Sequence, residues 1–132
     1  MSARSKARKA ALDLLFAADI RGSAPSLDEL ALMEREHREY TDVLVRGVGE
    51  HLQRIDSFIH SYAEGWDKDR LPAVDRNILR IAIFEMLWGE LDHAVAISEA
   101  LSLAEALSTS SSANFINGLL GRISALADSL PR

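Results

Sequence analysis

The chain has 132 residues, 48% of them hydrophobic and 27% charged, a balance typical of one globular domain and not of a disordered segment. It contains no cysteine, which excludes disulfides, thiolate zinc sites and cysteine nucleophiles and favours a location in the reducing cytoplasm. The net charge of -5 is unevenly spread, because residues 1–12 carry +4 and leave -9 for the rest. Such an asymmetry is typical of a basic arm that meets a polyanion.

The first predicted helix covers about residues 2–20, where alanine and leucine recur at the spacing of one buried helix face. Four cations surround its beginning: Arg4, Lys6, Arg8 and Lys9. Cations oppose the helix dipole at an N-terminus, so local stability does not favour them there. They become favourable when a nucleic-acid phosphate docks on the free N–H groups of the first turn. These residues alone support a nucleic-acid-binding arm and a frayed, solvated helix end about equally.

Two further helices are predicted in the first half of the chain. The first is short and lies around residues 27–31, and the second is long and runs from about residue 40 to residue 62. We interpret the charged stretch 34–39 as a solvated face or connector. Inside the long helix, Gly47 and Gly49 each cost about 1 kcal/mol relative to alanine, and one explanation is the close approach of another segment.

Residues 71–88 form the predicted central helix, with Pro72 in its first turn. Its apolar side chains point in every direction, so other helices must cover it on all sides. It is too short and too charged for a good membrane span. Charged groups on so buried a helix must be paired or must reach a surface, and internal ion pairing is the favoured interpretation for Arg76 and Arg80.

Two more helices are predicted after the central one. Residues 93–107 form the first, and the serine-rich stretch 108–112 supplies N-caps for a last helix that runs through Phe115 and on to Ile123. No stretch shows the alternation of a strand, so the predicted fold class is all-α with six or seven helices.

No catalytic constellation is visible in the sequence. The four histidines lack metal-ligand spacing, and neither a hydrolase nucleophile elbow nor a phosphate-binding loop occurs. Glu85 and Glu99 are conceivable paired carboxylates, but nothing in the sequence indicates that they converge. We therefore predict no enzymatic activity, no metal site and no cofactor.

Four motifs occur in order along the chain: a basic motif (residues 4–12), Leu-Pro-Ala-Val-Asp-Arg with its continuation (71–85), Val-Ala-Ile-Ser-Glu-Ala (95–100) and Phe-Ile-Asn-Gly-Leu-Leu (115–120). Together they resemble the successive motifs of the NusB family of transcription antitermination factors. The resemblance spans nearly the whole chain, and four motifs in order are far more specific than any one of them.

The resemblance implies a single NusB-like domain over residues 1–132. Two small helical bundles, at about 1–62 and about 66–128, share the central helix, and no enzymatic activity is expected. NusB-like proteins pair with the ribosomal protein NusE and grip the single-stranded boxA element of ribosomal RNA leaders. That complex helps the elongating RNA polymerase to pass terminators, so the partners implied are boxA RNA, NusE and the transcription elongation complex.

Carried over by position, the arginine-rich motif of the family falls on Arg4, Lys6, Arg8 and Lys9, which are expected to meet RNA phosphate and base edges. One family arginine position is Ser5 here, so the motif is thinner than in its richest members.

The candidate NusE-facing residues are Phe16, where other members often have tyrosine, and Glu85. Two further departures are Ser98, where the family often has asparagine, and Gly121, where some members have an acid. An acid there would repel phosphate, so glycine slightly favours RNA binding.

Two other functions share this fold. One is a homo-oligomeric helical interaction module, since some members of the family form homodimers. The other is an RNA-binding domain detached from an RNA cytosine methyltransferase, since NusB-like domains also precede such enzymes.

Overall fold

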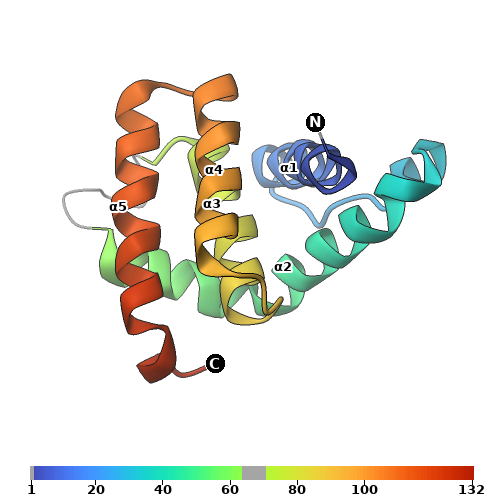
Figure 1. Cartoon of the computed structure of the whole chain (residues 1–132). Helices are drawn as coiled ribbons and strands as arrows, with labels where there is room; N and C mark the ends of the chain where they lie inside the picture. The colour runs from blue at the N-terminus through green and yellow to red at the C-terminus, as the bar shows by residue number, and fades with distance from the viewer. Residues whose placement is uncertain (1, 64–70) are drawn as a thin grey trace.

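The computed structural model describes residues 2–63 and 71–132, and every regular element in these ranges is helical (Figure 1). The α-helices are α1 (Ala3–Arg21), α2 (Arg35–Tyr62), α3 (Ala73–Leu87), α4 (His93–Leu107) and α5 (Ser110–Leu126). Two short 3-10 helices are η1 (Asp28–Leu32) and η3 (Ala127–Ser129). The all-α prediction is confirmed for the described residues, but the predicted six or seven helices become five α-helices there. The short helix predicted around residue 30 is a 3-10 helix, a conformation that is common in runs of only a few residues.

Side-chain caps define where three of the helices begin. The Ser2 hydroxyl accepts a hydrogen bond from the Ser5 N–H at 3.1 Å, and Asp92 and Thr109 cap α4 and α5 in the same manner. By contrast, α2 begins about five residues earlier than predicted. The charged stretch 34–39 is therefore no connector: it forms the N-cap and the first turns of α2. Glu34, Arg35 and Glu39 are exposed there, which agrees with the alternative of a solvated face.

The helix α3 packs against each of the other four α-helices, and every residue from Asn77 to Leu87 is buried. In Figure 1, α1 lies on one side of the molecule and the α4/α5 pair on the other, while α2 runs along both and contacts α1, α3 and α5. This arrangement confirms that the apolar segment is the central helix. No described helix has the length and hydropathy that a membrane span requires.

The contacts support the predicted division into two bundles that share α3, since α1 and α2 contact α3 and so do α4 and α5. The division itself stays a prediction. Its boundary, at about residues 62–66, falls next to the segment 64–70, which lies outside the described residues.

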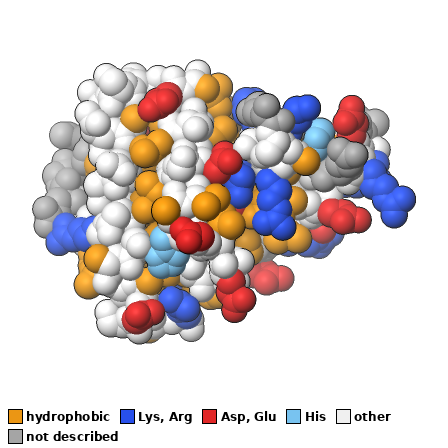
Figure 2. Space-filling view, in the orientation of Figure 1, with side chains coloured by type: hydrophobic (Ala, Val, Ile, Leu, Met, Phe, Trp, Pro, Cys, Tyr) orange, Lys and Arg blue, Asp and Glu red, His pale blue; other side chains and the backbone are white. Residues whose placement is uncertain are grey.

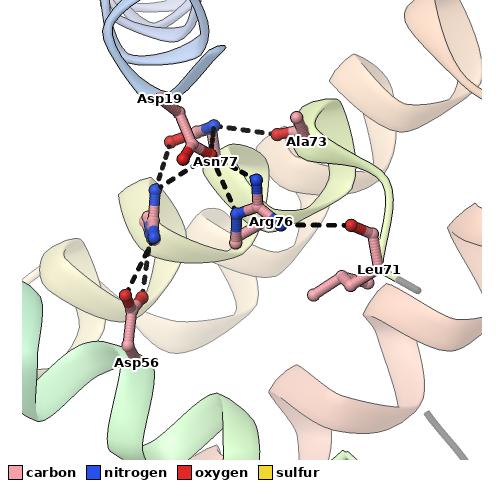
Figure 3. A network of polar contacts seen from close by, with 7 residues as sticks. Asp19, Asp56, Leu71, Ala73, Arg76 and Asn77 are labelled. Atoms are coloured by element: carbon pink, nitrogen blue, oxygen red, sulfur yellow. Dashed lines mark hydrogen bonds and ion pairs between the residues drawn. The ribbon is translucent and has the colours of Figure 1, made fainter. Parts of the chain in front are cut away.

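A polar network ties the first half of α3 to α1 and α2 (Figure 3). Arg76 Nε donates to Asp19 Oδ2 at 2.8 Å, and the Asn77 side-chain amide donates to the same oxygen at 3.0 Å. The Arg80 guanidinium donates a hydrogen bond to each carboxylate oxygen of Asp56, both at 2.8 Å. The prediction that both arginines of α3 form internal ion pairs is therefore confirmed. Burial raises the pKa of Asp19, but these hydrogen bonds and the nearby Arg80 charge lower it by more.

Gly47 lets α2 approach α3 closely, whereas Gly49 has no such role. A Cβ added to Gly47 would lie 2.2 Å from ring atoms of Phe84, but a Cβ added to Gly49 would meet nothing within 4 Å. The close approach predicted from the sequence thus exists at the first glycine, against an aromatic ring of the central helix.

We expect Gly47→Ala to lower the free energy of unfolding by about 1–3 kcal/mol, because the methyl group must displace the ring of Phe84. Gly49→Ala is the matched control in the same helix, and it should raise stability by up to about 1 kcal/mol. Urea denaturation followed by circular dichroism measures both. Equal stability of the two variants would contradict the packing described here.

Candidate nucleic-acid and partner interface

The N-terminal end of α1 presents a basic surface. Figure 2 shows Lys and Arg side chains gathered around this end of the helix, which faces the viewer in the common orientation of Figures 1 and 2. Arg4 and Lys6 are exposed. Lys9 is half-buried, and its Nζ lies 2.8 Å from an oxygen of Asp13 one turn later. Such a surface pair contributes at most about 1 kcal/mol, so Lys9 is free to exchange its partner for a phosphate.

Arg8 differs from its three neighbours because it points into the protein and is only 3% exposed. Its Nε lies 3.1 and 3.0 Å from the two carboxylate oxygens of Glu85, and its Nη2 lies 2.9 Å from one of them. Its Nη1 forms a longer ion pair, 3.4 Å, with Glu99. The prediction that Arg8 contacts RNA therefore needs correction. Its guanidinium is buried and forms ion pairs with Glu85 and Glu99, so it stabilises the fold.

Glu85 is likewise buried, with 1% of its surface exposed. Besides Arg8 it accepts a hydrogen bond from the hydroxyl of Tyr40 on α2. The sequence-based prediction placed this carboxylate at a partner-facing surface, and its position in the structure contradicts that expectation. A carboxylate on the most buried helix needs a cation, and α1 supplies one.

The electrostatics of the cluster follow from this geometry. Burial lowers the pKa of Arg8, but the hydrogen bond and charge of Glu85 raise it by more, so the guanidinium stays charged. Burial, followed by the hydrogen bond to the Glu85 carboxylate, raises the pKa of Tyr40 to about 12. The phenol therefore remains protonated and continues to donate at physiological pH.

One polar cluster thus joins four helices: Ser5 and Arg8 of α1, Tyr40 of α2, Glu85 of α3 and Glu99 of α4. Ser5 completes it, because its hydroxyl lies 2.9 and 3.0 Å from the two oxygens of Glu99. The sequence did not show that the two glutamates converge. The available signal was an acid, Glu85, in the otherwise apolar second half of α3, together with an arginine beside an alanine face.

Within residues 2–63 and 71–132, no three histidine or acidic side chains lie close enough to hold a metal ion. Both glutamates form an ion pair with Arg8, Glu85 at 2.9 Å and Glu99 at 3.4 Å. The chemistry that this surface offers is recognition through exposed cations.

A family model for NusB matches residues 5–125 of this sequence. The chain belongs to the NusB family. Its relatives include the transcription antitermination protein NusB of Salinispora tropica, which is 53% identical over 96% of this chain and 98% of that protein.

Solved NusB structures share the fold. The NusB of T. maritima superposes with a TM-score of 0.82 and 32% identity, covering 92% of this chain and 90% of that one. A crystal structure of the antitermination factors NusB and NusE in complex with dsRNA gives a TM-score of 0.83 at 26% identity, covering 95% and 98%.

The other positions singled out by the NusB motifs lie at or near the surface. Phe16 is half-buried on α1, and Ser98 and Gly121 are exposed on α4 and α5. Phe16 thus keeps part of its ring available to a partner. Nothing lies within 4 Å of a Cβ added at Gly121, so the structure has room for the first atom of a side chain at this position.

We expect Arg8→Met to destabilise the protein by about 3–5 kcal/mol, because it leaves the Glu85 charge buried without its cation. The double variant Arg8→Met, Glu85→Gln should recover part of this loss, since the buried charge of Glu85 is removed as well, while the partly exposed Glu99 still lacks its cation. Lys9→Met is the matched control from the adjacent exposed pair and should change stability by less than about 1 kcal/mol. Chemical denaturation measures all three. An Arg8→Met protein as stable as Lys9→Met would contradict the structural role.

Proposed function

We propose that this NusB family member is a non-enzymatic antitermination factor that binds the single-stranded boxA RNA of ribosomal RNA leaders together with NusE. The complex would join the RNA polymerase elongation complex and support processive transcription of ribosomal RNA. The observation that carries the proposal is a basic helix end with exposed cations in a chain of the NusB family. The solved assembly of a related NusB with NusE and dsRNA supports both partners.

The electrostatic part of RNA binding comes from Arg4, Lys6 and Lys9 in this proposal. Each cation that neutralises a phosphate releases a counterion, so affinity falls as salt rises. The free N–H groups of the first turn of α1 add donors for the same phosphates. Phosphate contacts position the strand, and the sequence of a single strand is read through its unpaired bases.

The partner-binding part requires a surface other than Glu85. Phe16 remains the candidate on α1, as an aromatic side chain with part of its ring exposed. The outer face of α4 adds a hollow of about 510 Å³ whose lining includes Ile97 and Leu101, and Val95 on the same helix is 45% exposed. We propose that NusE docks on these apolar surfaces and presents further RNA contacts, so that neither protein alone binds tightly.

The RNA part is tested with the double variant Lys6→Ala, Lys9→Ala. We expect weaker binding to boxA RNA and a log–log salt slope smaller by about 0.7 for each phosphate that is no longer neutralised. The matched control is Arg46→Ala, Arg54→Ala, which removes two exposed cations from α2 and should leave binding unchanged. Fluorescence anisotropy at several salt concentrations, with and without NusE, measures the effect. Equal affinity for boxA and scrambled RNA under all these conditions would contradict the specific proposal.

The partner part is tested with Phe16→Ala. We expect affinity for NusE to fall about thirtyfold or more, since truncating a buried aromatic anchor costs at least about 2 kcal/mol. RNA binding without NusE should not change. Ile20→Ala is the matched control one turn later on α1, where the side chain is 65% exposed. Calorimetric titration with NusE measures both variants, and equal affinities would exclude Phe16 from the interface.

A further inference from the structure

Tyr40 is held rigidly beside the basic end of α1. Its hydroxyl donates a hydrogen bond to the Glu85 carboxylate, which also accepts hydrogen bonds from the guanidinium of Arg8. The Arg8 guanidinium carbon also lies 5.5 Å from the centroid of the Tyr40 ring. An aromatic ring fixed at its hydroxyl and at its face has little freedom, so it is a firm support for any group that lies on it.

Arg4 is the group that lies on this ring. Its guanidinium carbon is 4.4 Å from the Tyr40 centroid, well within the range of a cation–π contact. Arg4 is exposed, and within the described residues no carboxylate pairs with it. Arg4 precedes Arg8 by one turn on the same side of α1, so the two guanidinium groups share one ring while only the outer one reaches solvent.

A guanidinium that rests on an aromatic ring presents its planar, weakly hydrated surface outward. Unpaired RNA bases stack on aromatic rings and on arginine planes. Lysine cannot replace arginine in such a contact, because its ammonium is a compact point charge. Arg4 therefore differs in kind from Lys6 and Lys9, which offer charge without a stacking plane.

We propose that Arg4 stacks against an unpaired base of the bound RNA and that Tyr40 is the positioning residue that holds it for this contact. The inference rests on the proposed function and adds a base-reading element to a surface otherwise made of phosphate contacts. Tyr40 acts through Arg4 and is not itself required to touch the RNA.

The test separates charge from stacking. Arg4→Lys keeps the charge, so the salt slope should stay as in the unmodified protein, while affinity for boxA RNA falls about five- to 150-fold when one base no longer stacks. Tyr40→Leu removes the supporting ring and should have the same effect. Tyr40→Phe keeps the ring and should bind nearly as well as the unmodified protein. Thermal unfolding checks that each variant is folded.

An abasic scan of the RNA provides the decisive readout. In the unmodified protein, one abasic position should weaken binding strongly, and the same position should cost nothing in Arg4→Lys. If the abasic position weakens binding equally in both proteins, or if Arg4→Lys binds as the unmodified protein does, the stacking role is overturned. If Tyr40→Leu fails to fold, Arg4→Lys and the abasic scan still decide. Absence of any RNA binding by the unmodified protein would instead overturn the proposed function, and the inference with it.

Discussion

The buried ion pair between Arg8 and Glu85 is the interaction on which the arrangement of the basic surface depends. Removing either partner leaves a charge in the core, so the two helices that carry them are held together. The fork of the guanidinium meets both carboxylate oxygens, and the Tyr40 hydroxyl takes up remaining acceptor capacity. In this way the first turns of α1 are fixed on α3.

Fixing α1 also fixes what its other cations can do. One motif of four basic residues is divided by helix geometry into an inward group and an outward group. Arg8 joins the core, Arg4 continues past it onto the ring of Tyr40, and Lys6 and Lys9 stay at the surface. The same cluster therefore stabilises the fold and sets the direction in which the RNA-facing side chains project.

Hydrophobic periodicity was sufficient to predict that the five α-helices exist and that α3 is central, and the bounds of α4 agree residue for residue with the prediction. It placed the start of α2 about five residues too late, because the first turns of that helix are charged. It was not sufficient for the site. The positive charge of Arg8 suggested a contact with RNA, but this side chain is buried. Its burial depends on how α1 packs across α3, and a local sequence pattern does not contain that information. Glu85 and Glu99 converge on Arg8 for the same reason, because their positions depend on how α3 and α4 pack against α1. Charged residues on the most buried helix were predicted to need partners, but only packing showed which partners.

The most direct test of this division of roles is NMR of the arginine side-chain Nε–H groups during titration with boxA RNA. The Nε–H of Arg8 should be protected from exchange in the free protein and should keep its chemical shift when RNA binds, because Glu85 holds it throughout. The Nε–H of Arg4 should shift on binding. A large shift or loss of protection at Arg8 would contradict the claim that this residue serves the fold while its neighbours meet the RNA.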